Sequence, residues 1–185
     1  HSTSSAASDV YKRQDLVDYL KQHYPALSLE ELANKVASPD VKGVFDSAIV
    51  GEKQVPLAAY EHARFVLRPQ LQGAYAELYS KYHLDALVFP TVPAAPAPIS
   101  GADNEVLLNG QKVPTFPTYI RNTDPGSNAG IPGISLPAGL SKAGHPVGLA
   151  LDGPAWSDPR LISLGLAVED VLGKIPLSPL CKAKI

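Results

Sequence analysis

The sequence predicts an α/β fold in which part of a β-sheet is flanked by helices. Short apolar runs between glycines and prolines are typical of buried strands, and they occur at Ala86–Phe89, Ile134–Leu136 and Val147–Leu151. Longer segments carry apolar residues three and four positions apart, which is the spacing of an amphipathic helix; Leu161–Leu172 is one of them.

The first segment, His1–Gln14, is rich in serine and alanine and shows no apolar period. It resembles a translated sequencing adaptor, so we expect it to be foreign to the fold; an ordinary disordered tail is the alternative. The chain of 185 residues contains no methionine, and we therefore expect a processed or truncated product. Residues 15–185 suit one domain or part of a larger one.

The N-terminal part of the remaining chain is predicted to be helical. A helix over Asp15–Tyr24 ends at Pro25. Ser28 and Glu31 form a capping-box pattern at the start of a second helix, which reaches about Val36.

Two further helical stretches follow. One begins at Ser38-Pro39 and extends through Phe45, and a longer one runs from Pro56 to about Tyr82. Pro69 lies inside the longer one and should kink or divide it, because proline lacks the N–H that a helix interior requires. The apolar face expected after Pro69 consists of Leu71, Ala74, Tyr75, Leu78 and Tyr82.

In the C-terminal part, Asn109-Gly110 predicts a hairpin turn between Val106–Leu108 and Val113. The glycine-rich segment Asn122–Pro132 is predicted to be a loop feeding the next strand, either as the wall of a small-molecule pocket or as a tight structural turn. Asp158 is expected to cap the last helix. The face that this helix should bury consists of Leu161, Leu164, Val168, Val171 and Leu172.

Composition and charge argue against several classes of partner. A formal net charge of −2 gives no reason to propose nucleic acid or an anionic membrane. We find no apolar run of membrane-spanning length and no signal-peptide pattern. The single cysteine, Cys181, cannot form an internal disulfide, which is compatible with a cytoplasmic location.

The residues Asn128–Gly139 (NAGIPGISLPAG) and Pro146–Gly153 (PVGLALDG) resemble the C-terminal part of the amidase signature family, as do Asp85–Pro93. The resemblance implies carboxamide hydrolysis, with residues 15–185 as the C-terminal part of a single domain whose mixed β-sheet is flanked by helices. Asn122–Asn128 is similar to the branch that acts on arylacetamides such as indoleacetamide and mandelamide. It implies no cofactor, a small-molecule amide substrate and a possible homodimer in the full-length enzyme.

The same resemblance implies a catalytic lysine and two serines, which the family places upstream of the matched part. No double-serine, glycine-rich run occurs in this chain, so we expect it to contain no catalytic residue and to be inactive alone. What it should contribute is substrate selection. The predicted substrate-binding residues are Thr91, Asn122, Thr123, Ser127, Asn128 and Ile131, with Tyr119 and Trp156 as further apolar walls.

Three alternatives remain open at this point. The chain could be a non-catalytic binding module for a small molecule or a protein. It could belong to a glutaminase-like amidotransferase subunit. It could also be an independent hydrolase that uses Ser127, although Gly126–Gly130 lacks the register of a nucleophile elbow. The spacing of the five histidines gives no metal-binding pattern.

Overall fold

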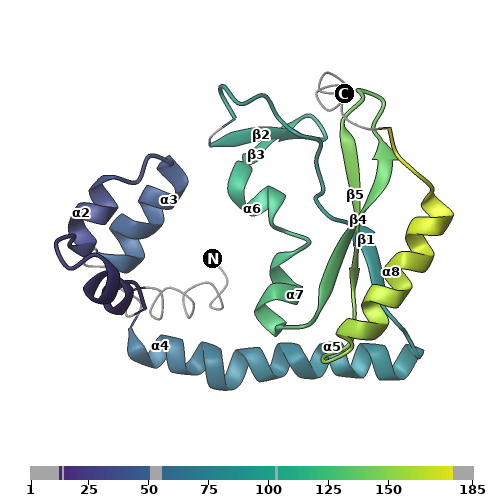
Figure 1. Ribbon diagram of the computed structural model, residues 1–185, viewed down its shortest axis with the longest axis horizontal. Coiled ribbons are helices and arrows are strands. Elements are labelled where there is room, and N and C mark those ends of the chain that lie inside the picture. The colour runs from purple at the N-terminus through teal and green to yellow at the C-terminus, as the bar shows by residue number, and fades with distance from the viewer. Residues whose placement is uncertain (1–12, 14, 51–55, 103, 177–185) are drawn as a thin grey trace. The chain divides into compact units, whose positions relative to one another are not determined.

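The structure is a computed structural model that describes residues 13, 15–50, 56–102 and 104–176 (Figure 1). The chain divides into two compact units, residues 1–73 and 74–185, and the boundary falls within helix α5 (Arg68–Tyr82). Apart from Arg13, the predicted tail His1–Gln14 lies outside the described residues, and so does Cys181. Arg13 donates a hydrogen bond to the backbone carbonyl of Ile49.

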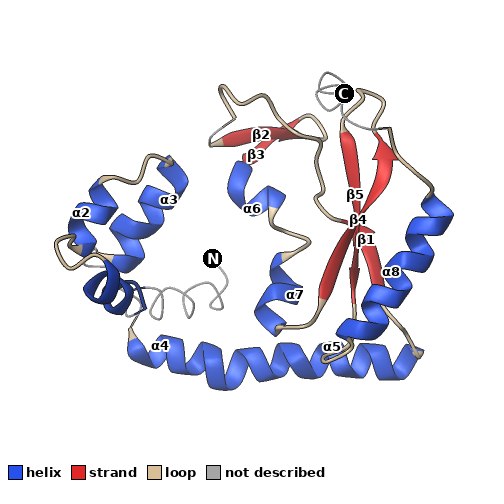
Figure 2. Cartoon of the chain, in the orientation of Figure 1, coloured by secondary structure: helices blue, strands red, loops and turns tan. Residues whose placement is uncertain are grey.

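The first unit consists of helices (Figure 2). Residues 15–23 are helical, as predicted. The elements that follow are α2 (Leu29–Asn34), α3 (Pro39–Val44), the π-helical turn η1 (Phe45–Ile49), α4 (Leu57–His62) and a second π-helical turn, η2 (Ala63–Leu67). Leu20, Leu29 and Ile49 form a small buried cluster among them.

The predicted capping box at the start of α2 is confirmed. The Ser28 hydroxyl accepts a hydrogen bond of 3.1 Å from the N–H of Glu31. In return, the Glu31 carboxylate accepts one of 2.8 Å from the N–H of Ser28. Two N–H groups that a helix start leaves without intrahelical partners are thereby satisfied.

The interruption expected at Pro69 occurs as a π-helical turn just before it. Pro69 cannot donate to the carbonyl four residues earlier, and the N–H of Arg68 bonds the carbonyl of Ala63, five residues back. The wider π-helical turn therefore separates α4 from α5.

The second unit carries a three-stranded sheet in the order β1-β5-β4, and both strand pairings are antiparallel. Its strands and helices are β1 (Leu87–Pro90), β2 (Glu105–Leu108), β3 (Gln111–Pro114), α6 (Thr115–Tyr119), α7 (Asp124–Ala129), β4 (Gly133–Leu140), β5 (Pro146–Asp152) and α8 (Asp158–Leu172). The predicted α/β class, with a sheet flanked by helices, is confirmed.

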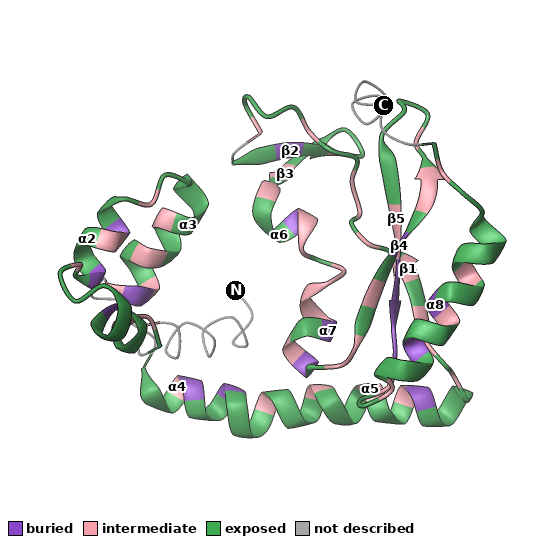
Figure 3. Ribbon diagram, in the orientation of Figure 1, coloured by how far each residue is buried: buried purple, intermediate pink, exposed green. Residues whose placement is uncertain are grey.

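Helix α8 packs against the sheet, mainly on β4 (Figure 1). Leu136, Leu151 and Leu161 form the buried cluster between them, and buried residues concentrate on the central strand β5 (Figure 3). Gly165 permits the close approach of α8, since a Cβ there would lie 3.1 Å from the Cδ1 of Ile134.

The hairpin predicted at Asn109-Gly110 is confirmed. Strands β2 and β3 pair with Leu108 opposite Gln111, and both turn residues have positive φ, 52° and 79°. This is the combination that a two-residue type I′ turn requires.

Strand β4 is longer than predicted. The run Ile134–Leu136 was expected to end at Pro137, but β4 continues through it to Leu140. The strand tolerates proline because β4 is at the edge of the sheet formed by the described strands, where only one side of the strand has to supply hydrogen bonds.

Two predicted buried faces are wrong in part. On α5, Tyr79 is the buried tyrosine, whereas Tyr82 is 57% exposed. On α8, Val171 is 86% exposed and Leu172 39% exposed, because these residues follow the part of the helix that contacts the sheet cluster. Helical spacing gives the face of a helix, but it does not give how far a neighbour extends along it.

Two predictions of local structure also need correction. Asn122–Pro132 is not a continuous loop, because it contains α7. The residue that precedes α8 as its cap is Ser157 rather than Asp158, and the Ser157 side chain makes no capping bond. Within the described ranges, no helix is long and apolar enough to cross a membrane.

Candidate functional site

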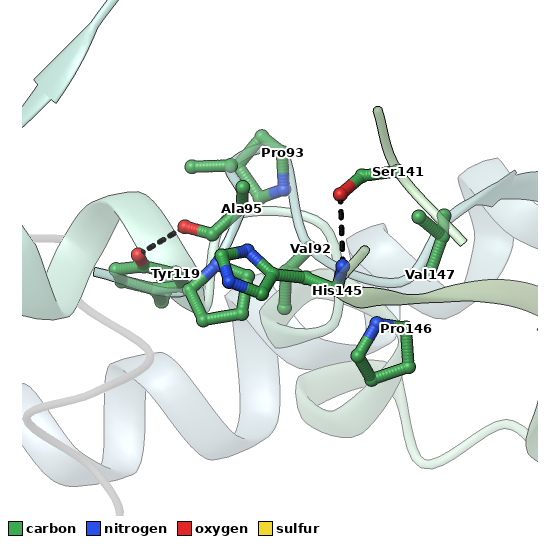
Figure 4. Close-up of a pocket in the computed structure, with 10 residues that line it drawn as sticks. Val92, Pro93, Ala95, Tyr119, Ser141, His145, Pro146 and Val147 are labelled. Atoms are coloured by element: carbon green, nitrogen blue, oxygen red, sulfur yellow. Dashed lines mark hydrogen bonds between the residues drawn. The ribbon is translucent and has the colours of Figure 1, made fainter. Parts of the chain in front are cut away.

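Two hollows of the second unit are lined by residues that the structure describes. The larger has a volume of about 340 Å³ and is drawn in Figure 4. It is lined by Val92, Pro93, Ala94, Ala95, Pro96, Tyr119, Ser141, His145, Pro146 and Val147. The six predicted substrate-binding residues are absent from this set.

Two hydroxyls of the larger hollow form hydrogen bonds with its own backbone. The Tyr119 hydroxyl donates to the carbonyl of Ala95 at 2.6 Å, and the Ser141 hydroxyl accepts from the N–H of His145 at 3.1 Å (Figure 4). The rest of the lining is the His145 side chain and a largely apolar surface of prolines, alanines and valines.

The smaller hollow has a volume of about 260 Å³ and brings four predicted residues together: Thr91, Thr123, Ser127 and Ile131. Its other lining residues are Gly126, Gly133, Ile134, Ser135, Ala150 and Asp152. Hydroxyls, one carboxyl and isoleucine side chains thus share one small space, which is the composition of a site for a small molecule.

Thr91 enters this hollow because β1 ends just before it. Its N–H donates to the carbonyl of Gly148 on β5 at 2.9 Å, which extends the strand pairing by one residue. Its hydroxyl oxygen lies 2.6 Å from that of Ser135 on β4. Gly148 leaves the room for this pair, since a Cβ there would lie 2.6 Å from Oγ1 of Thr91 and 3.0 Å from Oγ of Ser135.

Helix α7 positions the other predicted residues. The Ser127 hydroxyl donates to the carbonyl of Thr123 at 3.0 Å, and the Thr123 hydroxyl donates to that of Ile120 at 3.3 Å. Gly130 ends the helix in the left-handed conformation, with φ of 73°, and turns the chain so that Ile131 reaches the hollow.

Asn122 and Asn128 are not among the lining residues. The Asn122 side chain donates to the carbonyl of Pro90 at 2.8 Å, and thereby joins the segment before α7 to the end of β1. The Asn128 side chain donates to the carbonyl of Asp124, one turn back in its own helix, at 3.0 Å. The Asn122 amide thus links two segments of the site, whereas the Asn128 amide bonds within its own helix, and the assignment of both to substrate binding stays a prediction.

Trp156, the expected apolar wall, is 94% exposed and lines neither hollow. Tyr119 lines the larger hollow instead of the smaller one. A nucleophilic role for Ser127 gains no support, because its proton is directed to a backbone carbonyl and no histidine is among the residues that line this hollow. Across the described ranges, no group of three or more His, Cys, Asp or Glu residues could hold a metal ion.

Sequence reasoning missed Asp152 and Ser135. Asp152 directly follows the predicted strand Val147–Leu151, and it is 8% exposed and lines the smaller hollow. Burial raises the pKa of its carboxyl above the usual value. The sequence did contain a signal for this residue: Asp152 directly follows an apolar run, and β5 extends to include it.

A sequence model of the family described as Amidase matches residues 2–162. The chain belongs to the amidase family. The resemblance read from its motifs is therefore confirmed. The match begins inside the segment His1–Gln14, and the proposed boundary at residue 14 stays a prediction.

The curated relatives of this amidase chain include an indoleacetamide hydrolase of Agrobacterium vitis, 44% identical over 157 residues, covering 85% of this chain and 33% of that protein. A mandelamide hydrolase of Pseudomonas putida is 38% identical over 173 residues, covering 89% of this chain and 33% of its own length. The chain thus spans about a third of the length of these relatives.

Solved structures support the same fold. An amidase crystal structure superimposes with a TM-score of 0.57 at 27% identity, covering 83% of this chain and 31% of that one. The native peptide amidase from Stenotrophomonas maltophilia superimposes with a TM-score of 0.53 at 23% identity, covering 86% and 31%. The second likeness concerns the fold alone.

Proposed function

We propose that this chain is part of an enzyme that hydrolyses arylacetamide-type carboxamides to carboxylate and ammonia. The observation that carries the proposal is the family match over residues 2–162, together with relatives named for indoleacetamide and mandelamide hydrolysis. The smaller hollow supplies the place in this chain where a substrate would be selected.

We assign the acyl part of the substrate to the smaller hollow. Ile131 and Ile134 offer apolar contact to a ring, and Thr91, Thr123 and Ser127 offer hydroxyls that can orient polar atoms. A space of about 260 Å³ suits a small ring system better than a peptide.

The bond-breaking step belongs to residues outside this chain. Amide hydrolysis requires an activated nucleophile, a proton donor for the departing ammonia and donors for the oxyanion. In the described part, the hydroxyls of the smaller hollow bond backbone carbonyls or one another, and histidine is absent from its lining. We therefore expect the chain to be inactive alone and to act as the selecting part of the whole enzyme.

We further propose a cytoplasmic enzyme without a nucleic-acid or membrane partner, which forms a homodimer in its full-length form. The net charge of −2 supports the lack of an anionic partner, and the single cysteine supports the cytoplasmic location.

The test is to assay ammonia release by the full-length enzyme that contains this chain, using indole-3-acetamide, mandelamide and phenylacetamide. We expect release from at least one of them by the full-length enzyme and none from residues 15–185 alone. A full-length enzyme that releases no ammonia from any of the three would overturn the proposal.

A further inference from the structure

The residue that the proposed function leaves without a role is Asp152, at the end of the central strand β5. Its backbone is fixed, because its carbonyl accepts a hydrogen bond of 2.7 Å from the buried hydroxyl of Tyr79. Its side chain lines the smaller hollow, although the residue is only 8% exposed. A carboxyl this deeply buried requires an explanation.

Two glycines provide the space for this carboxyl. A Cβ on Gly133 would lie 2.7 Å from Oδ1 of Asp152, and a Cβ on Gly126 would overlap with Oδ2. Gly133 begins β4 and Gly126 lies inside α7, where glycine weakens the helix by comparison with alanine. Both positions are thus occupied by the one residue type that lets the carboxyl lie between them.

The carboxyl oxygens accept no hydrogen bond and form no ion pair with any residue that the structure describes. The titratable groups that face it are Tyr75 and Tyr79; burial chiefly, and the charge of Asp152 in addition, raises the pKa of both phenols. The Tyr79 hydroxyl is already used by the backbone carbonyl. The carboxyl oxygens are accessible from the smaller hollow, so a bound molecule there can supply the donor that they lack among the described residues.

The residues around the carboxyl indicate the chemical character of the molecule that would bind there. Ile131 and Ile134 make part of the hollow apolar, and the hydroxyls of Thr91 and Ser135 already bond each other. Asp152 is the residue that brings a carboxyl to this hollow, and its carboxyl oxygens meet no donor among the described residues. Either protonation state of a carboxyl keeps acceptor capacity, so the argument does not depend on its charge.

We propose that Asp152 is a specificity-determining residue, which accepts a hydrogen bond from an N–H on the ring of an aromatic acyl group. This inference rests on the proposed function, because it places the acyl group in the smaller hollow. It adds the substrate class: a bicyclic arylacetamide whose ring carries an N–H, in preference to one of the same shape without a donor.

The test compares two matched substrates in the full-length enzyme that contains this chain. Indole-3-acetamide carries the ring N–H, and benzofuran-3-acetamide has the same shape with an oxygen in its place. We expect kcat/KM to be about tenfold to a hundredfold higher for the indole, since the benzofuran leaves the Asp152 carboxyl without its hydrogen-bond donor. The variant D152L should bring the ratio close to one.

Two further variants keep the test decisive. D152N preserves shape and an acceptor oxygen, so it should retain part of the preference even if D152L folds poorly. D85N changes an exposed carboxylate that pairs with Arg160 outside both hollows, and it should leave the ratio unchanged.

Three outcomes can be told apart. Loss of the preference in D152L alone supports the inference. An unchanged preference in D152L, or no preference in the unmodified enzyme, overturns it; this is also the result expected if a group of the protein itself pairs with Asp152. Ammonia release from neither substrate nor from mandelamide and phenylacetamide removes the proposed function, and this inference with it.

Discussion

Tyr79 and Asp152 lie 73 positions apart in the sequence and are joined by a hydrogen bond of 2.7 Å from the tyrosine hydroxyl to the aspartate carbonyl. The bond fixes α5 to the end of β5, next to the smaller hollow. Burial, with smaller contributions from Asp152 and Tyr75, raises the pKa of Tyr79, so its hydroxyl stays protonated and able to donate over the physiological range.

The first prediction concerns this bond. Tyr79→Phe should lower the free energy of unfolding by about 1–3 kcal/mol, because it leaves a buried carbonyl without its donor. Urea denaturation followed by circular dichroism measures the change. Tyr82→Phe is the matched control on the same helix, since Tyr82 is 57% exposed. Equal, small effects from both variants would contradict the assigned role.

The second prediction concerns pH. Because burial raises the pKa of Asp152 above its ordinary 3.8, the folded state favours the protonated form. The resulting stability is fully present below the pKa of the unfolded chain, and it is lost as the pH rises through the folded pKa. Asp152→Asn removes this dependence, so the variant should gain stability relative to the unmodified chain as the pH rises from acid toward neutral.

Denaturation curves of both proteins across that pH range provide the measurement. The exposed Glu31, whose pKa is lowered chiefly by its hydrogen bond to the Ser28 backbone, has the opposite dependence, but it is present in both proteins and cancels. A difference between the two proteins that stays constant with pH would show that Asp152 titrates normally.

The third prediction concerns Gly126. Gly126→Ala should destabilise the chain by about 1–3 kcal/mol, because the new methyl group and the Asp152 carboxyl would occupy the same space. Gly73→Ala is the control: Gly73 is also inside a helix, but a Cβ there meets nothing within 4 Å. This control should stabilise the chain by about 0.5–1 kcal/mol.

A double variant tests the cause of that loss. Adding Asp152→Ala should relieve the overlap, so the cost of Gly126→Ala should shrink when both changes are present. Additive effects would mean that the methyl group is resisted by something other than this carboxyl.

The fourth prediction concerns the hydroxyl pair of Thr91 and Ser135. A double-mutant cycle of Thr91→Val and Ser135→Ala should give a coupling energy of about 0.5–1.5 kcal/mol, the range of one hydrogen bond. Thermal or urea unfolding of the four proteins measures it. Strict additivity of the two single changes would show that the 2.6 Å separation carries no interaction of its own.

The elements predicted correctly are those that are stabilised by residues close to one another in the sequence. Ser28 and Glu31 satisfy each other within one turn, and Asn109-Gly110 meets the φ requirements of its turn without help from distant residues. The wrong details depend on distant neighbours. Tyr79 is buried rather than Tyr82, and Val171 is exposed, because of where the packed partner begins and ends.

Helix α7 shows why amino-acid composition led to the wrong prediction of a continuous loop in this segment. Glycine and proline over Asn122–Pro132 favour a loop. Pro125 lies in the first turn of α7, where its missing N–H removes no helical bond, and Gly126 is a glycine because Asp152 lies against it. The position of Pro125 in a first helical turn could have been read from the sequence. The contact between Gly126 and Asp152 becomes known only from the fold.

The candidate site was predictable in its outline. The end of β1 and the segment before β4 were both expected to face a substrate, and Thr91, Thr123, Ser127 and Ile131 do lie around one hollow. Asp152 was not predicted, because its burial and its distance from Gly126 and Gly133 arise only when three elements pack together.

The proline within β4 has a consequence for how the sheet can associate. An edge strand with a regular row of N–H groups invites pairing with another chain, which is a route to aggregation. Pro137 contributes no N–H, and the register shift between Pro137 and Leu140 interrupts the strand further. This edge is therefore a poor template for intermolecular strand addition, and replacing Pro137 with a β-branched residue would make the chain more prone to form fibrils.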